Sequence, residues 1–199
     1  LFLGAWVVFG VVVDLWSRTK GMQRLLRLPR ADWGKAFAHA GLGITMFAIA
    51  GLSAWEEEDI RVANLGETFQ VGALELRLDK VERVPGPNYF STMGTVTVTQ
   101  GGALITRLYP EKRDYPVARM PTTEAAIDYR LLRDIYVVLG DQQATGGWTI
   151  RTYIKPLANW IWGGCLIMAL GGFLSLSDRR FRVAAGARKP SVSTKVAAE

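Results

Sequence analysis

Cysteine and histidine, two side chains that carry much of enzyme chemistry, are almost absent from this chain of 199 residues. It has one cysteine, Cys165, and one histidine, His39. Both lie in long apolar stretches, so residues 56–156 contain neither. That region therefore has no internal disulfide and no dithiol chemistry, and it builds no catalytic triad or dyad on cysteine or histidine.

Charge is also missing from three long stretches. Residues 36–55 and 157–177 contain no Asp, Glu, Lys or Arg, and residues 1–16 contain only Asp14. A helix rises about 1.5 Å per residue, so twenty residues cover about 30 Å, the thickness of a bilayer's hydrocarbon core. We therefore predict a transmembrane helix in each of the three stretches.

The chain opens on Leu1 within the first of these stretches. It lacks the basic segment and the small-residue cleavage site of a signal peptide. We expect it to begin inside a transmembrane helix. It is then either a piece of a larger polytopic protein or one polypeptide of a naturally split protein.

The charged residues that remain predict an orientation in the membrane. Residues 17–35 carry six basic residues and one acidic one, and residues 178–199 carry six basic and two acidic ones, whereas residues 56–156 have a net charge of −2. By the positive-inside rule, the basic loop and tail are cytoplasmic and residues 56–156 are periplasmic. We thus predict a multi-pass protein of the bacterial inner membrane. Nucleic acid is not an expected partner, because the basic residues flank spans and form no separate domain.

Residues 56–156 have the alternating pattern of short strands. Leu74, Leu76 and Leu78 alternate with charged residues, and Val96 and Val98 alternate with threonines. Further apolar runs cover residues 135–139 and 148–154, and Gly, Pro or Asn separate the runs. Residues 122–133 instead have near-helical spacing and predict a short helix. The predicted fold is α + β, with a β-rich periplasmic domain, a small barrel or sandwich, inserted between the second and third transmembrane helices.

His39 is the residue in the spans that most needs an explanation, because an imidazole at membrane depth is costly. With a helical period, His39, Gly43, Met46 and Ala50 fall along one side of residues 36–55. Small residues beside a histidine suit two arrangements. Another helix packs closely there while the ring only snorkels or hydrogen-bonds, or a flat porphyrin is ligated by the imidazole.

Two short polar segments and an acidic run stand out in residues 56–156. The sequences GPNY (86–89) and PEKRDY (110–115) are either contact surfaces or turns whose composition reflects turn geometry alone. The acidic run at residues 56–59 is expected to be a solvated junction, since it lacks the spacing of a calcium loop.

Many short motifs in order along the chain resemble one family. They are AHAGLGI at 38–44, GPNY at 86–89, PEKR at 110–113, TEAAID at 123–128, RDIYVVLGD at 133–141, W-x-I-R-x-Y-x-K-P at 148–156, WIWGG at 160–164, MALGG at 168–172 and DRR at 178–180. Together they resemble the C-terminal third of CcmF, the cytochrome c-type biogenesis family that includes the haem lyase subunit.

The resemblance implies a function in cytochrome c maturation. A CcmF protein accepts haem from a haem chaperone and helps to attach it to the C-x-x-C-H thiols of apocytochrome c, together with other maturation subunits. The family also holds a haem b between two transmembrane histidines, and His39 matches one of these axial ligands. The second ligand and the tryptophan-rich segment that presents substrate haem lie outside this chain. The chain is therefore not expected to be an active enzyme alone, and no catalytic residue is assigned in it.

Two hypotheses follow for the role of this chain. In the first, His39 holds a haem b that helps to reduce the substrate haem, with a quinol as the electron donor inferred from the family. In the second, the chain is a non-catalytic scaffold whose periplasmic domain docks maturation partners, and His39 only packs. A third reading, part of a solute transporter, predicts broken helices with charges near the midplane. Asp14 is its only candidate.

Overall fold

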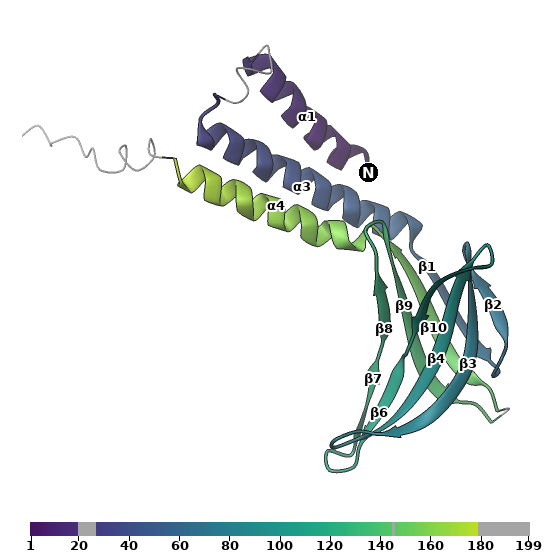
Figure 1. Cartoon of the computed structure of the whole chain (residues 1–199). Coiled ribbons are helices and arrows are strands. Elements are labelled where there is room, and N and C mark those ends of the chain that lie inside the picture. Colours follow the sequence, from purple (N-terminus) through teal and green to yellow (C-terminus); the bar gives the residue numbers. More distant parts are fainter. Residues whose placement is uncertain (20–26, 145, 179–199) are drawn as a thin grey trace, which may run out of the picture.

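In the part of the chain that the structure describes, three helices lie side by side and a β-sandwich extends from one end of them (Figure 1). This computed structural model describes residues 1–19, 27–144 and 146–178. The helices are α1 (Phe2–Thr19), α3 (Arg30–Trp55) and α4 (Ala158–Leu176), and each is long and apolar enough to cross a membrane. Residues 20–26 of the predicted basic loop and residues 179–199 of the predicted tail lie outside the described residues.

Helix α3 begins six residues before the predicted span, at Arg30 instead of Ala36. Its 26 residues make a helix of about 39 Å, longer than the hydrocarbon core, so its first turns extend into the interface where Arg30, Asp32 and Lys35 are tolerated. Pro29 gives no side-chain cap. Instead the Asp178 carboxylate, at the end of α4, accepts a hydrogen bond from the Ala31 amide at 3.0 Å. This is a cap supplied by another helix, which sequence patterns near residue 30 do not reveal.

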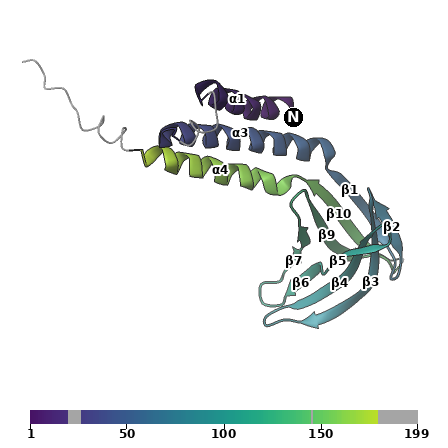
Figure 2. The same cartoon turned by 45° about the horizontal axis from the view of Figure 1, so that its top comes forward.

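Glycine makes the contact between α3 and α4 a backbone-to-backbone contact. A Cβ at Gly41 would lie 2.5 Å from the Gly164 carbonyl oxygen, and one at Gly34 would lie 2.6 Å from that of Gly171. On the other side of α3, a Cβ at Gly43 would lie 2.8 Å from the Gly4 carbonyl oxygen of α1. Helix α3 therefore lies between α1 and α4 (Figure 2). In lipid such packing is a main source of helix association, because burial of apolar surface there provides little driving force.

The domain between α3 and α4 is a sandwich of two antiparallel sheets. One has the order β1-β10-β9-β8 and the other β2-β3-β4-β6-β7, with β5 paired to β4. The strands are β1 (Glu57–Ala63), β2 (Thr68–Val71), β3 (Leu74–Pro85), β4 (Phe90–Gln100), β5 (Ala103–Leu108), β6 (Glu111–Tyr115), β7 (Met120–Glu124), β8 (Ala126–Tyr129), β9 (Arg133–Gln142) and β10 (Trp148–Pro156). The predicted β-rich domain is thus a sandwich.

The sandwich core is formed by the alternating residues that the sequence pattern identified. Leu74, Leu76 and Leu78 of β3 are fully buried, as are Val96 and Val98 of β4. Facing residues of the other sheet complete the core: Ile135, Val137, Leu139, Ile150 and Ile154. The prediction of strands in these segments is confirmed.

The predicted helix at residues 122–133 is wrong. This segment forms the end of β7 and all of β8, followed by a turn. Strand β8 pairs with β9 from Ala126↔Val137 to Tyr129↔Asp134, and β7 pairs with β6. The residues of β7 and β8 are half-buried or exposed, with no buried face to impose alternation, and pairing with neighbouring strands overrides weak helix propensity.

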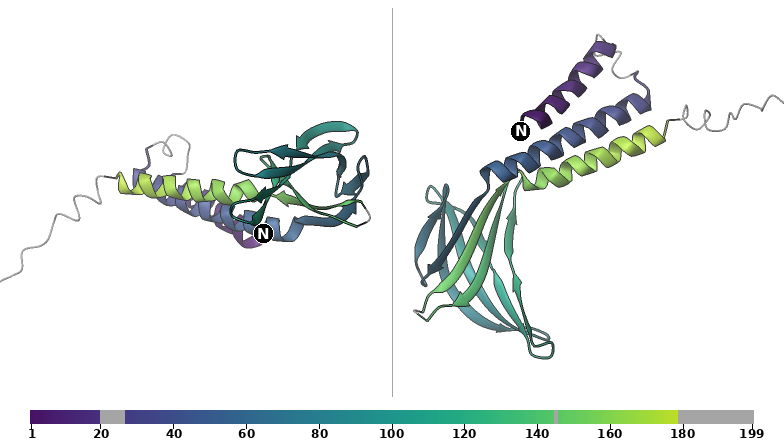
Figure 3. Two further views of the ribbon diagram at one scale, coloured as in Figure 1. Left: turned by 90° about the horizontal axis from the view of Figure 1, so that it is seen from below. Right: turned by 180° about the vertical axis from the view of Figure 1, so that it is seen from behind.

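The connection from β10 to α4 is fixed to the β8–β9 turn. Leu157, which joins strand and helix, has a φ of 61°, a conformation that is unfavourable for a leucine. Its amide donates to the Leu132 carbonyl at 2.9 Å, and Asn159 Nδ2 donates to the buried Asp134 carboxylate at 2.7 Å. Strand β1 pairs with β10 directly below the helices, from Glu57↔Ile154 onward. The helix pair α3 and α4 therefore continues into a strand pair (Figure 3).

The glycine contact predicts opposite effects at two adjacent positions of α4. Gly171→Ala would place a Cβ 2.5 Å from the Ala38 amide nitrogen, whereas Gly172→Ala would meet no atom within 4 Å. Overpacking costs about 1–3 kcal/mol, and alanine gains about 1 kcal/mol of helix propensity at either site. We expect Gly171→Ala to lower the thermal unfolding midpoint in detergent and Gly172→Ala to maintain or raise it. Equal midpoints would contradict the packing.

The ionisation of Asp79, a carboxylate on β3 of the sandwich, is linked to stability. Burial raises the pKa of Asp79, but hydrogen bonds from Thr97 and Arg77 outweigh burial and hold the pKa below its usual value. The resulting stability is present above the unfolded pKa and is lost as the pH falls through the lower folded pKa. Asp79→Asn should therefore destabilise the protein at pH 7, by at most about 1 kcal/mol because the side chain is partly exposed, and progressively less below about pH 4. Thermal unfolding at several pH values measures this, with Glu82→Gln in an exposed ion pair as the control.

Candidate functional site

His39 lies on α3, two to three turns from its N-terminus, and its ring is solvent- or lipid-accessible. Its Nδ1 lies 2.9 Å from the Lys35 carbonyl oxygen, one turn earlier in the helix. Because a carbonyl oxygen only accepts, this hydrogen bond places the proton of the neutral ring on Nδ1 and leaves the Nε2 lone pair available. A backbone carbonyl that accepts the second ring N–H is the usual support of a metal-binding histidine.

His39 lines a cleft between α1 and α3. The cleft has a volume of about 330 Å³, and its lining residues are Trp6, Val7, Gly10, Val11, Asp14, Lys35, Ala36 and His39. A Cβ at Gly10 would meet no atom within 4 Å, so this part of α1 stands away from α3. The volume is at the lower end of the range of about 300–1,000 Å³ for ligand pockets. The cleft is large enough for part of a flat ligand whose remainder extends beyond these helices.

A group of charged side chains lies at one end of the cleft. The Asp14 carboxylate of α1 accepts from Lys35 Nζ of α3 at 2.7 Å and from Arg18 Nε at 2.8 Å, and Arg18 also approaches Asp32 at 3.4 Å. In the sequence, Asp14 is a break in the first apolar stretch and the one candidate charge for a transport site. The spacing of Asp14 and Arg18 by one helical turn was a signal for an ion pair, but the partner on α3 depends on helix packing.

This pairing removes the main support for the transporter interpretation. Helices α1, α3 and α4 are continuous over their described residues, and Asp14 lies near the end of α1 in an ion pair. A transport site at the membrane midplane would instead need interrupted helices.

The small residues of α3 pack against two different helices. Gly34 and Gly41 face α4, and Gly43 faces Gly4 and Val8 of α1, so helix packing accounts for all three. The open part of the α1–α3 interface begins one turn earlier, at His39. The predicted stripe from His39 to Ala50 is therefore not one continuous slot, since α1 covers it at Gly43.

The acidic run at residues 56–59 forms ion pairs on β1 and β10. Glu56 pairs with Lys155 at 3.2 Å, Glu58 with Arg151 at 3.3 Å, and Asp59 with Arg61 at 2.5 Å. Among the residues that the structure describes, no group of three or more His, Cys, Asp or Glu side chains is arranged to hold a metal ion.

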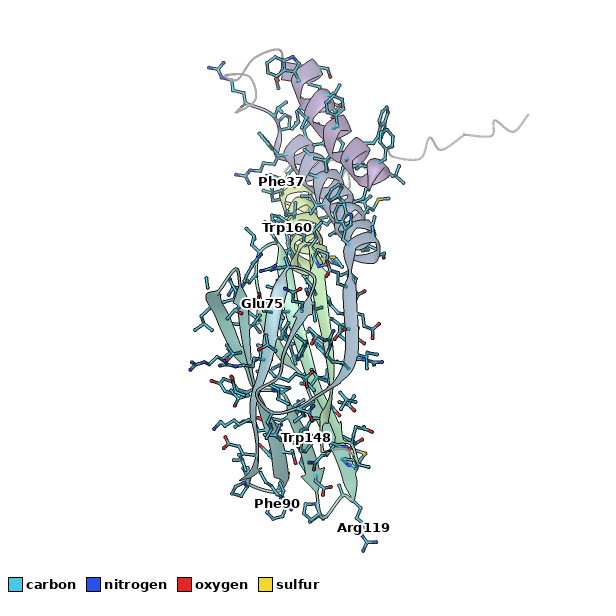
Figure 4. All side chains as sticks on the ribbon, turned by 90° about the vertical axis from the view of Figure 1, so that its right-hand side faces the viewer. Phe37, Glu75, Phe90, Arg119, Trp148 and Trp160 are labelled. Carbon is cyan, nitrogen blue, oxygen red and sulfur yellow. The ribbon has the colours of Figure 1, made fainter. Side chains whose placement is uncertain are left out.

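The two segments singled out in the sequence come together at the end of the sandwich that is far from the helices. GPNY is the turn between β3 and β4, but turn geometry does not explain PEKRDY, because its residues 111–115 form strand β6. The Tyr89 ring of GPNY packs on Tyr115 with centroids 5.3 Å apart, and the Arg113 guanidinium lies 4.7 Å above it. Arg113 donates to Glu111, which also accepts from Ser91. Burial raises the pKa of Glu111, but these two bonds hold it below its usual value. Phe90 and Arg119 mark this end in Figure 4.

Comparison with known proteins gives a consistent result. A family model described as the CcmF C-terminal beta-sandwich matches residues 54–156. The cytochrome c-type biogenesis protein ccl1 of Rhodobacter capsulatus is 57% identical over 99% of this chain. The cytochrome c-type biogenesis protein CycK of Rhizobium meliloti is 43% identical over 94% of it, and CcmF of Pseudomonas aeruginosa is 39% identical over 91%.

The fold is also found in a solved structure. The cytochrome c haem lyase CcmF matches 74% of this chain with a TM-score of 0.63 at 17% sequence identity, over 25% of that structure's length. The chain spans 28% to 30% of the length of the three relatives named above. Because the family model covers more than half of the chain, including the whole sandwich, the chain belongs to the CcmF family of cytochrome c-type biogenesis proteins.

Proposed function

We propose that this chain forms part of a haem lyase that attaches haem to apocytochrome c, and that His39 is one axial ligand of a membrane haem b. The observation that carries the proposal is the hydrogen bond from His39 Nδ1 to the Lys35 carbonyl beside an open cleft. It prepares Nε2 as a metal ligand and fixes the orientation of the ring. A haem held by histidine on both faces supplies one-electron transfer, because its iron has no open position.

The residues around His39 complete one half of a site. The α1–α3 packing at Gly43 closes the cleft on one side, and apolar residues such as Val7 and Val11 exclude water from its α1 wall. The Asp14–Lys35 ion pair joins the two helices one turn from His39 and keeps the ring's own carbonyl partner in place. The second axial ligand lies outside this chain, in the part of the protein that the longer relatives have in addition.

The membrane orientation is part of the same proposal. The charged ends of α1 and α3 and the basic segments next to them face the cytoplasm of a bacterium, and the sandwich lies in the periplasm. The periplasmic side is where a haem chaperone, apocytochrome c and other maturation subunits are accessible. A quinol in the bilayer is the proposed electron donor. The lyase reaction needs the remainder of the protein, so this chain alone is inactive.

The haem ligand is tested with the full-length protein that contains this chain. His39→Ala should abolish the haem b absorbance of the purified protein, and His39→Gly with added imidazole should restore it, because free imidazole can occupy the vacated position. Met46→Leu, two turns along the same helix, is the control and should retain the spectrum. An unchanged haem b spectrum in His39→Ala would refute the assignment.

The sandwich supports a second function, the docking of a protein partner at its far end. Two segments more than twenty residues apart, GPNY and PEKRDY, converge there, and Val117 and Met120 beside them are 96% and 58% exposed. Exposed apolar side chains next to a rigid aromatic–arginine cluster are typical of interaction surfaces. We propose that maturation partners bind this end, whether or not His39 holds haem.

A variant at the surface of the sandwich distinguishes partner docking from haem ligation. Val117→Asp should weaken co-purification of maturation partners with the full-length protein while leaving the haem b spectrum unchanged, since a carboxylate in an apolar contact is costly to desolvate. Ile60→Asp, at an exposed position of β1, is the control and should retain partners. Equal recovery of partners with both variants would mean that the far end is not the docking surface.

A further inference from the structure

The turn between β8 and β9 exposes large apolar side chains that the sandwich does not need for its core. Tyr129, Leu131 and Leu132 are 68%, 70% and 65% exposed, and Arg130 and Arg133 stand next to the two leucines. We propose that this turn, residues 129–133, inserts into the interfacial layer of the bilayer beside α4 and anchors the sandwich to the membrane surface. The proposal rests on the helices being transmembrane and is independent of haem binding.

The position of the turn relative to the helices supports insertion. The Leu132 carbonyl accepts from the Leu157 amide at 2.9 Å, and the Arg130 carbonyl accepts from Asn159 Nδ2 at 2.9 Å. Helix α4 begins at Ala158, so the turn is hydrogen-bonded to the first turn of a membrane span. Figure 4 places Trp160 where the helices meet the sandwich, and tryptophan is favoured at the membrane–water interface. The two leucines therefore lie at interfacial depth.

The apolar surface of the turn is continuous with that of the helices. Leu132, Leu157 and Trp160 line one end of an apolar groove of about 570 Å³, whose other lining residues, Phe9 and Val12 among them, come from α1 and α3. Phe9 and Val12 are 65% and 57% exposed. No polar side chain interrupts this lining, so acyl chains that cover α1 also reach Leu132.

The arginines indicate lipid as the occupant. Arg130 Nη2 donates to the Ile105 carbonyl at 2.9 Å and Arg133 Nη2 donates to Gln100 at 2.8 Å, so both guanidinium groups point from the turn back toward the sandwich. The leucines stand at the tip of the turn, and the arginines and the tyrosine stand behind them. Acyl chains would meet the leucines, and phosphate headgroups would meet the cationic and tyrosine side chains. Arg130 Nε also pairs with the Asp128 carboxylate of β8 at 2.5 Å, which holds this guanidinium group behind the leucines.

Insertion would give the sandwich a third attachment to the membrane. The first two are the covalent connections from α3 to β1 and from β10 to α4, which lie next to each other because β1 and β10 pair. Two adjacent attachments leave a hinge, whereas a third on β8–β9 at the other edge of the same sheet fixes the tilt of the sandwich. The far end would then stay at a constant height above the bilayer.

The test uses single cysteines labelled with an environment-sensitive fluorophore in the full-length protein in nanodiscs. With Cys165 and any other cysteine replaced by serine, Leu131→Cys reports on the turn. Leu166→Cys, exposed on α4, is the reference for lipid, and Val117→Cys at the far end is the reference for water. Lipids with spin labels at the headgroup or deep in the acyl chain, and iodide in the aqueous phase, act as quenchers.

We expect the label at position 131 to have blue-shifted emission relative to position 117. Its quenching should be stronger with headgroup spin labels than with deep ones, the reverse of position 166, and iodide should quench it less than position 117. Emission and iodide quenching equal to those of position 117 would overturn the proposal. Blue-shifted emission without quenching by either lipid would also overturn it, because the turn would then be covered by protein.

Discussion

The contact between α3 and α4 is the interaction on which the rest of the structure depends. Gly34 and Gly41 of one helix meet Gly171 and Gly164 of the other, so the two backbones touch without intervening side chains. In a bilayer, where burial of apolar side chains gives little driving force, this close approach is what joins the helices. It also sets the spacing at which the chain leaves α3 and returns to α4. That spacing is short enough for β1 and β10 to pair at once, so the helix pair determines where the sandwich begins.

Helix α1 uses the same small-residue packing on the opposite side of α3, but over only part of its length. It meets α3 at Gly43 and is connected again through the Asp14–Lys35 ion pair, and between these contacts lies the His39 cleft. The two helices are in contact at both ends of this stretch and are separated between the contacts, and this keeps the cleft open. The imidazole there is supported by its own helix, because its Nδ1–H donates a hydrogen bond to the Lys35 carbonyl oxygen. This arrangement leaves Nε2, the nitrogen proposed to bind haem iron, without a hydrogen bond to any other side chain in the described residues.

The two ends of the sandwich have different proposed functions. The end next to the helices has leucines, tyrosine and arginines in its β8–β9 turn, a composition suited to a lipid interface. The far end has Tyr89, Arg113 and Tyr115 in contact, with exposed Val117 nearby, a composition suited to protein contacts. The strands between the two ends enclose one apolar core formed by residues from both sheets.

Local patterns in the sequence determined the number of apolar helices, the β-rich character of residues 57–156 and the segments of the core strands, because hydrophobic length and alternation are properties of neighbouring residues. They also identified His39, since it is the one histidine in the chain. Only the tertiary structure decided that residues 122–133 are strands and a turn, that Asp178 caps α3, and that Asp14 pairs with Lys35. Asp178 and Asp14 each contact a residue of another helix, and β7 and β8 need their neighbours β6 and β9. The energy of such contacts exceeds the weak preferences that a local pattern expresses.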